Sequence, residues 1–97
     1  MLTSKQRSSL RSLASVIDPI MQVGKGGIND NLIKSLSEAL EKREIIKISV
    51  LNNSETDAKE IANELSKKLT AELVAVIGKK IILYRKSQRE NFNHIEF

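Results

Sequence analysis

The amino-acid sequence predicts an α/β fold: one domain in which helices pack a four-stranded mixed sheet, in the order α-β-α-β-α-β-β. Three segments carry apolar residues at helical spacing, and short β-branched runs lie between and after them. Gly78 and Lys79 separate the last two runs, as in a two-residue hairpin turn with glycine first. A chain of 97 residues suits a single domain, and it contains no cysteine for disulfides or thiolate metal sites.

The first predicted helix begins after Thr3, which has capping-box spacing to Gln6. Its apolar face repeats at i, i+3, i+4 and i+7 and comprises Leu10, Leu13, Ala14 and Ile17. Pro19 is expected to end this helix at Asp18, because the residue before a proline avoids the helical region. The short apolar run at residues 20–23 then predicts a buried strand.

The second predicted helix follows Asn29, which is a suitable N-cap residue. Its apolar stripe comprises Leu32, Ile33, Leu36, Ala39 and Leu40. Residues 45–51 are β-branched and apolar and predict a strand. Lys47 and Ser49 would lie on one face of that strand, opposite three apolar side chains, namely Ile46, Ile48 and Val50.

The third predicted helix follows a turn at residues 52–53, with Ser54 and Asp57 as its cap. Its apolar positions are Ala58, Ile61, Ala62, Leu65 and Leu69. The continuous apolar run at residues 73–77 predicts a central strand, and residues 81–84 return as the last strand. Right-handed crossovers that move the same way along the sheet would put the second and third helices on one face. The first helix must then cover the remaining apolar surface.

The predicted domain spans residues 1–86, and residues 87–97 are expected to form a flexible or partner-dependent tail. This tail is polar, with three isolated apolar residues, Phe92, Ile95 and Phe97. The sequence shows neither an internal repeat nor a segment of low complexity.

Basic residues concentrate at the two ends of the chain, within a formal net charge of +4. Residues 1–29 and residues 73–97 each carry a net +3, whereas residues 30–72 carry a net −2. If the ends meet, they form a positive face suited to nucleic acid or an anionic membrane; the alternative is ordinary surface charge. No apolar run approaches the roughly 20 residues of a membrane span, and no signal-peptide core is present, so we expect a cytoplasmic protein.

Gly24, Lys25, Gly26 and Gly27 form a loop between the first predicted strand and the second predicted helix. Glycines let the backbone approach a partner closely, lysine adds a positive charge, and free N–H groups at a helix N-terminus favour anions. Such a loop suits a phosphate. The alternative is a tight connection in which one glycine relieves backbone strain.

Further basic side chains could extend a phosphate site. Arg7 and Arg11 are four residues apart and share a face of the first helix that differs from its apolar face. Arg85 and Lys86 follow the last strand, where they could contact a partner or discourage edge pairing.

The residue types argue against catalysis. His94 is the only histidine and lies in the tail, so neither a catalytic residue nor a metal ligand is expected, and no cofactor is implied. A Walker loop needs a serine or threonine after its lysine, and the chain has glycine there. Tyr84 is the one aromatic residue on the predicted sheet, and base stacking needs two or three, so recognition of an RNA is expected to depend on its backbone and shape.

An ordered set of short stretches resembles the CRM domain, and more narrowly the stand-alone bacterial YhbY family. The stretches lie at residues 2–7, 10–14, 19, 23–27, 39–41, 44–48, 76–79 and 82–85, so the resemblance spans residues 2–86. Asn29 stands where the family often has threonine, and Arg43 where histidine is frequent. The tail after Lys86 carries no part of the resemblance.

The resemblance implies a fold similar to the C-terminal domain of a bacterial translation initiation factor. It also implies RNA binding through the glycine loop, and association with precursors of the large ribosomal subunit. We therefore expect a ribosome-assembly protein, not an enzyme, that acts as a monomer on ribosomal RNA. Its expected contacts are Gly24, Lys25, Gly26, Gly27, Lys5, Arg7, Arg11, Lys79, Arg85 and Lys86.

Two rival hypotheses remain open. The chain could be a protein-interaction module that binds a ribosomal protein or assembly factor through its sheet or tail, with sensitivity to Tyr84 or Phe92. It could also use the glycine loop for the phosphate of a nucleotide, although it lacks acid, base and metal-binding residues for hydrolysis.

Overall fold

The computed structural model describes residues 2–24, 28–51, 55–89, 93–95 and 97. The predicted order of elements is confirmed: α1 (Ser4–Ala14), β1 (Met21–Val23), α2 (Asp30–Arg43), β2 (Ile45–Val50), α3 (Glu55–Leu69), β3 (Glu72–Ile77) and β4 (Lys80–Tyr84). The four strands form one mixed sheet, as the sequence predicts.

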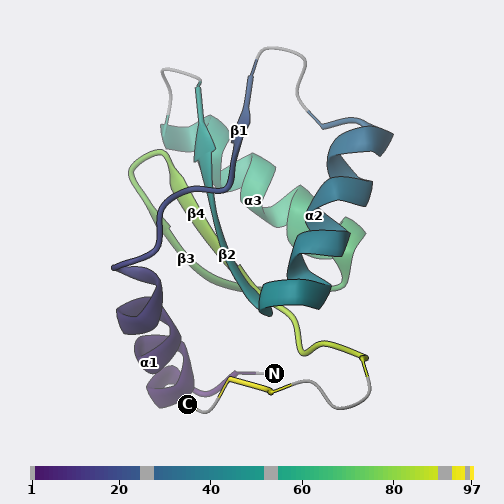
Figure 1. The fold of residues 1–97 in the computed structure, drawn as a ribbon. Coiled ribbons are helices and arrows are strands. Elements are labelled where there is room, and N and C mark those ends of the chain that lie inside the picture. Colours follow the sequence, from purple (N-terminus) through teal and green to yellow (C-terminus); the bar gives the residue numbers. More distant parts are fainter. Residues whose placement is uncertain (1, 25–27, 52–54, 90–92, 96) are drawn as a thin grey trace.

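The sheet has the strand order β1-β2-β4-β3. β1 pairs with β2 in parallel, whereas β4 pairs antiparallel with both β2 and β3. Both helical crossovers, β1-α2-β2 and β2-α3-β3, therefore move the same way along the sheet, and right-handed connections place α2 and α3 on one face. Figure 1 shows those two helices on one side of the sheet and α1 on the other, which confirms the expected arrangement.

The prediction that residues 73–77 form a central strand is wrong, because β3 pairs only with β4 and lies at the edge of the sheet. Its apolar run has a different cause: α3 packs against one face of β3 and α1 against the other. A strand that is covered on both faces needs apolar residues at successive positions, whatever its place in the sheet.

Helix α1 begins as predicted but ends earlier. Gln6 N donates to Thr3 Oγ1 at 3.1 Å and Thr3 N donates to Gln6 Oε1 at 3.0 Å, which completes the capping box. The last turn tightens at Ser15, whose N–H donates to the carbonyls of both Arg11 and Ser12. The helix thus stops before Pro19 constrains it, and Ile17 still reaches the apolar cluster beneath α1.

Two further local predictions are confirmed. Asn29 caps α2, with Leu32 N donating to Asn29 Oδ1 at 2.8 Å. Gly78 adopts φ 58° in the two-residue turn between β3 and β4, a conformation that favours glycine. The predicted turn at residues 52–53 and the Ser54 cap lie outside the described residues.

The sheet separates two apolar clusters. The larger one lies beneath α2 and α3 and includes Val23, Leu36, Leu40, Ile46, Ile48, Val50, Ala58, Ala62, Leu65, Leu69, Ile81 and Leu83. The smaller one lies beneath α1 and contains Leu10, Ala14, Ile45, Val74, Ile82 and Tyr84. Only the first cluster extends to the carboxyl ends of β1 and β2, so α1 leaves part of its own face of the sheet uncovered.

Replacing Leu83 by alanine is expected to lower the free energy of unfolding by about 2–5 kcal/mol, because the side chain is fully buried on an interior strand. Urea denaturation measures the loss. Leu51→Ala removes the same atoms from a residue that is 58% exposed, and it should change stability by about 0.5 kcal/mol or less. Equal effects of the two substitutions would contradict the assigned core.

Candidate nucleic-acid interface

The glycine loop leaves the sheet where three segments meet. Leu51 N donates to the Val23 carbonyl at 2.9 Å, and Val50 N donates to the Lys79 carbonyl at 2.8 Å. The end of β1, the end of β2 and the β3–β4 turn are thereby joined at the upper end of the sheet in Figure 1. Lys79 thus lies at the same end of the sheet as the start of the loop, with the end of β2 between them.

Gly24 is the one loop glycine among the described residues; the predicted contacts Lys25, Gly26 and Gly27 lie outside them. Gly24 is exposed, and a Cβ atom placed there would meet only Leu51 Cδ1, at an ordinary contact distance of 3.7 Å. Packing within the domain therefore does not require glycine at position 24. This favours the hypothesis in which a partner approaches the backbone.

The far side of the loop reaches the N-terminus of α2. The first turns of a 14-residue helix present unpaired N–H groups and a partial positive charge, which attract anions. Asp30 in the first turn opposes that attraction. The strand and the helix that flank the predicted phosphate loop are thus present in the described residues.

Helix α1 covers only part of its face of the sheet, and the rest of that face carries a lysine, Lys80, that the sequence analysis did not place there. Ser49 and Lys80 are register partners on β2 and β4, and Lys80 Nζ donates to Ser49 Oγ at 2.9 Å. Lys47 lies two residues before Ser49, on the same face of β2. Lys80 also follows Lys79 in the chain. These three residues, Lys47, Lys79 and Lys80, lie on this face of the sheet or in the adjoining turn, and they are called the sheet lysines below.

The signal for the sheet lysines was present but incomplete. Alternation along β2 already placed Lys47 and Ser49 on one face. Adding Lys80 requires the register of a strand that pairs with β2 from a distant part of the chain. Periodicity along one strand does not supply that register.

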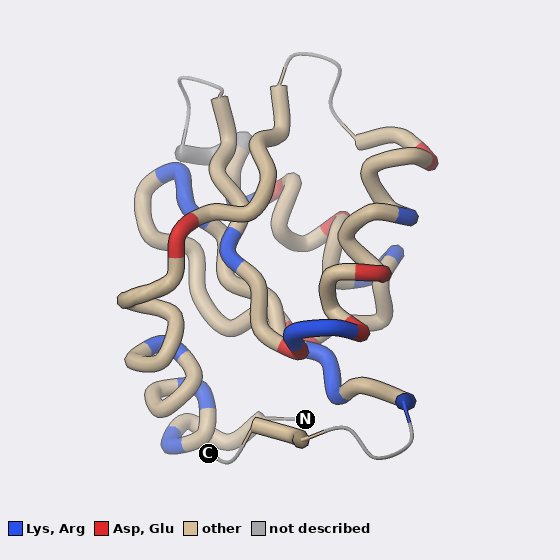
Figure 2. The backbone as a smooth tube through the Cα atoms, viewed as in Figure 1, with Lys and Arg blue, Asp and Glu red and all other residues tan. Residues whose placement is uncertain are grey.

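The basic residues of α1 form a separate group. Lys5, Arg7 and Arg11 are all exposed, and the two arginines lie one helical turn apart as predicted. Figure 2 shows this group at the end of the molecule opposite to the upper loop end, where the β3–β4 turn lies. The structure therefore places Lys79 at the same end of the sheet as Gly24 and the basic residues of α1 at the other end of the molecule.

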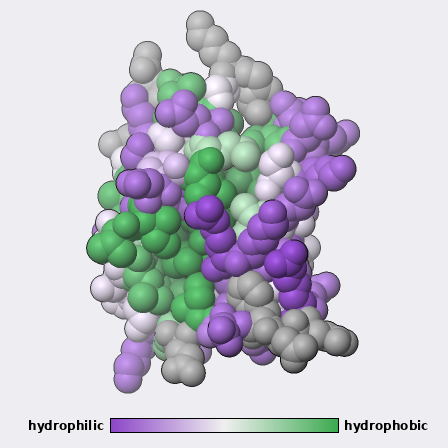
Figure 3. Space-filling view, viewed as in Figure 1, coloured by the Kyte–Doolittle hydropathy of each residue, from purple (hydrophilic) through white to green (hydrophobic). Residues whose placement is uncertain are grey.

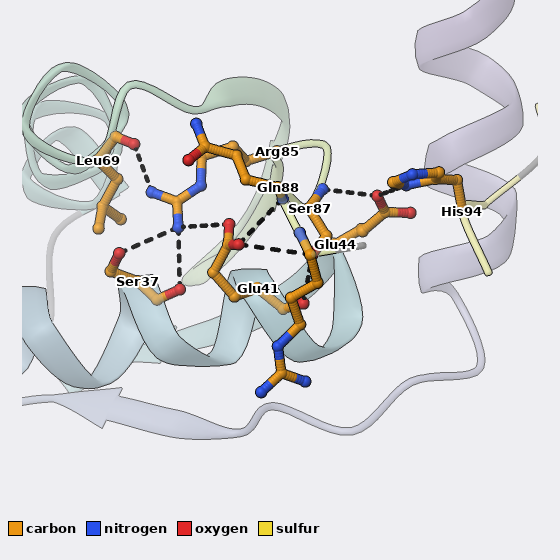
Figure 4. Close-up of polar contacts among 9 residues, drawn as sticks. Ser37, Glu41, Glu44, Leu69, Arg85, Ser87, Gln88 and His94 are labelled. Carbon is orange, nitrogen blue, oxygen red and sulfur yellow. Dashed lines mark hydrogen bonds and ion pairs between the residues drawn. The ribbon is translucent and has the colours of Figure 1, made fainter. Parts of the chain in front are cut away.

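Arg85 lies between helices, in contrast to the exposed Lys86 beside it. Its guanidinium donates to the Leu69 carbonyl at 2.8 Å, to the Ser37 carbonyl at 2.9 Å and to Ser37 Oγ at 3.0 Å. It also pairs with Glu41 at 3.3 Å (Figure 4). These contacts tie the end of β4 to both α2 and α3, so a structural role accounts for the side chain.

Glu44 joins α2 to β2 and binds the C-terminal segment. Its carboxylate is fully buried and accepts from Ser87 N at 2.7 Å, from Ile95 N at 2.7 Å and from His94 Nδ1 at 2.5 Å (Figure 4). Burial raises the pKa of Glu44, but the hydrogen bonds from His94, Ser87 and Ile95 outweigh it, so the pKa lies below its ordinary value. The buried charge therefore depends on donors from the segment.

The C-terminal segment also covers an aromatic side chain. The rings of Tyr84 and Phe97 meet edge to face, with centroids 5.0 Å apart, and Tyr84 is only 8% exposed. Burial and the nearby charge of Glu44 raise the pKa of the Tyr84 phenol. Tyr84 is thus not open to base stacking. From the sequence, residues 87–97 are expected to be flexible. These contacts do not measure motion, so that expectation stays a prediction.

An apolar surface adjoins this covered end. Leu13 on α1 and Val16, which follows the helix, are 43% and 88% exposed. Figure 3 shows apolar side chains gathered on the α1 half of the visible face, whereas hydrophilic ones cover α2. Surfaces of this kind mark contacts with other macromolecules more often than solvent-facing helices do.

Two other kinds of site find no support in the part of the chain that the structure describes. No group of three or more metal-ligating side chains converges there. No helix in those residues is long and apolar enough to cross a membrane.

The chain matches the CRS1 / YhbY (CRM) domain over residues 2–85. It is 53% identical over 88 residues to the probable RNA-binding protein YqeI of Bacillus subtilis, covering 91% of this chain and 92% of that protein. An RNA-binding protein of Haemophilus influenzae is 29% identical over 87 residues, with coverages of 90% and 88%. The solution structure of a hypothetical protein from Staphylococcus aureus has a TM-score of 0.82 and 54% identity, covering 94% of this chain and 95% of that one.

Replacing Arg85 by lysine is expected to lower the free energy of unfolding by about 1–3 kcal/mol, because a single ammonium cannot reach the acceptors on both helices. Chemical denaturation measures the change. Arg7→Lys is the matched control, since Arg7 is exposed and should tolerate lysine within about 0.5 kcal/mol. A neutral Arg85→Lys substitution would show that these hydrogen bonds do not hold the helices together.

Stability should fall in acid partly through Glu44. Its folded pKa is lowered from 4.5, so its contribution is complete above that value and disappears as pH falls through the folded pKa. Denaturation at a series of pH values should show the wild type converging on Glu44→Gln as pH falls. Glu38→Gln, an exposed change on the same helix, should run parallel to the wild type. A Glu44→Gln difference that stays constant with pH would contradict the assignment.

Proposed function

Because this chain belongs to the CRS1 / YhbY (CRM) domain family, as its sequence resemblance indicates, we propose that it is an RNA-binding protein without enzymatic activity. We further propose that its RNA is ribosomal, in precursors of the large subunit, and that it acts as a monomer in the cytoplasm to assist ribosome assembly. The observation that carries the RNA site is that Gly24, the exposed first residue of the loop, lies at the same end of the sheet as Lys79 and Lys80.

The proposed contact follows from charge and access at that end. Gly24, with Gly26 and Gly27, lets the RNA backbone approach, and Lys25 supplies the countercharge. Lys79 and the other two sheet lysines extend the positive surface along the open half of the sheet. Phosphates are the natural ligands of such a surface, because it offers ammonium groups and, among the described residues at this end, no aromatic ring.

The remaining predicted residues take different parts in the proposal. Lys5, Arg7 and Arg11 would contact a second stretch of the same RNA, because they lie at the other end of the molecule. Lys86 is exposed and could join them. Arg85 would act by positioning the neighbouring elements, since its guanidinium already donates to two helices.

A second candidate function follows from the apolar surface on α1. Leu13 and Val16 could dock a ribosomal protein or assembly factor in place of RNA. Such binding would depend weakly on salt, because burial of apolar side chains would drive it. It would be sensitive to Val16→Asp and insensitive to Lys25→Ala.

Crosslinking in cells followed by sequencing of the bound RNA tests the proposed partner. Enrichment of large-subunit precursor RNA is the expected result. A matched strain that expresses Lys25→Ala should recover less of it. If no ribosomal RNA is recovered above background, the proposal is wrong.

Substituting alanine for Lys25 or Lys80 should weaken binding to ribosomal RNA fragments about equally across sequences, because phosphate contacts carry no base information. The slope of log affinity against log salt should fall by about one for each lysine that binds a phosphate. Fluorescence anisotropy over a range of salt concentrations measures both quantities.

Lys34→Ala is the matched control, since Lys34 is exposed on α2, on the other side of the sheet. It should leave the slope unchanged. Equal slopes for the wild type and Lys25→Ala would remove the loop from the site, and equal slopes for Lys80→Ala would remove the sheet lysines.

A further inference from the structure

The C-terminal segment donates hydrogen bonds to Glu44 and Glu41 at the end of α2. Glu44 lies between α2 and β2, and all three donors to its carboxylate come from Ser87, His94 and Ile95. The adjacent Glu41 adds its carbonyl, which accepts from Ser87 Oγ at 2.8 Å, and its carboxylate, which accepts from Gln88 N at 3.0 Å. The end of α2 thus serves as a receptor for the segment.

Glu44 is an unfavourable residue for the place that it occupies. Its φ of 64° lies in the region that favours glycine, and helices commonly end with glycine at such a position. Its carboxylate is also fully buried, which is costly for a charge without partners. The contacts with the segment are the compensation visible in the structure.

A second anchor lies at the end of the chain. Phe97 packs against Tyr84, and Ile95 packs against the apolar cluster beneath α1. Ile95 connects the two anchors, because its N–H donates to Glu44 while its side chain lies in that cluster. Loss of one anchor should therefore weaken the other.

We propose that the described part of the C-terminal segment, residues 87–89, 93–95 and 97, acts as an intramolecular latch. Ser87, His94, Ile95 and Phe97 close it on Glu44 and Tyr84, and it opens as one unit that exposes the Tyr84 end of the sheet. Ser87 and Phe97 lie at opposite ends of the latch and share no contact that the structure shows. A response of one to substitution of the other is thus the signature of a single unit.

The titration of Tyr84 can be followed without interference from other residues. Tyr84 is the only tyrosine and the chain has no tryptophan, so tyrosinate absorbance reports this residue alone. Among the described residues, the charged or titratable groups near the Glu44 carboxylate include His94 of the latch and Tyr84 of β4, with Glu41 and its partner Arg85 beside the same segment. Phe97→Ala alters none of these side chains directly, so a shift in the Tyr84 titration would report movement of the latch away from Tyr84 and Glu44.

The test measures amide hydrogen exchange by NMR in the full chain. Phe97→Ala should raise the exchange rates of both the Ser87 and Ile95 amides by about tenfold or more, and it should move the Tyr84 titration toward its ordinary value. Amides of β4 should keep their protection. Leu51→Ala, an exposed apolar change at the other end of the sheet, should leave all three readings unchanged.

Glu44→Gly is a second, independent test. Glycine adopts the positive φ of position 44 without strain, and the substitution removes the carboxylate that accepts from the latch. Faster exchange at Ser87 and Ile95 with β4 still protected would show that the latch opens on an intact domain. The proposal is overturned if Phe97→Ala accelerates Ile95 without Ser87, or if Glu44→Gly leaves both amides protected.

Discussion

The dominant constraint on this fold is that three helices must cover a four-stranded sheet on two faces. Two right-handed crossovers that run the same way commit α2 and α3 to one face, so the other face has α1 alone. A helix of 11 residues covers only part of that face. Lys47, Ser49 and Lys80 occupy what remains, because polar side chains are what an uncovered sheet surface can carry at little cost.

Local chemistry made most of the fold predictable, and long-range pairing made the rest unpredictable. The caps at Thr3 and Asn29 and the glycine turn at Gly78 involve residues at most three apart, so the sequence contains them directly. The place of β3 depends instead on which strand pairs with β2. The apolar run of β3 arises because α1 and α3 cover its two faces. An edge strand and a central strand can both be covered in this way, so the run does not tell them apart.

The candidate site divides in the same way. The flanks of the glycine loop were predictable because strand, loop and helix are consecutive in the chain. Lys80 was not, since its partnership with Ser49 needs the register across β2 and β4. Arg85 was predicted as a contact because the sequence identifies it as a cation. Only the structure shows that its guanidinium donates to carbonyl groups of two helices.

The two ends of the partly covered face differ in what completes them. At the Tyr84 end, the chain supplies its own cover through Ile95 and Phe97. At the glycine-loop end, Lys79 and Lys80 are exposed, and Gly24 is exposed without a packing requirement for glycine. A partner that brings phosphates would cover the glycine-loop end of this face, as Ile95 and Phe97 cover the Tyr84 end. This asymmetry favours a phosphate contact at the loop over base stacking at the single tyrosine.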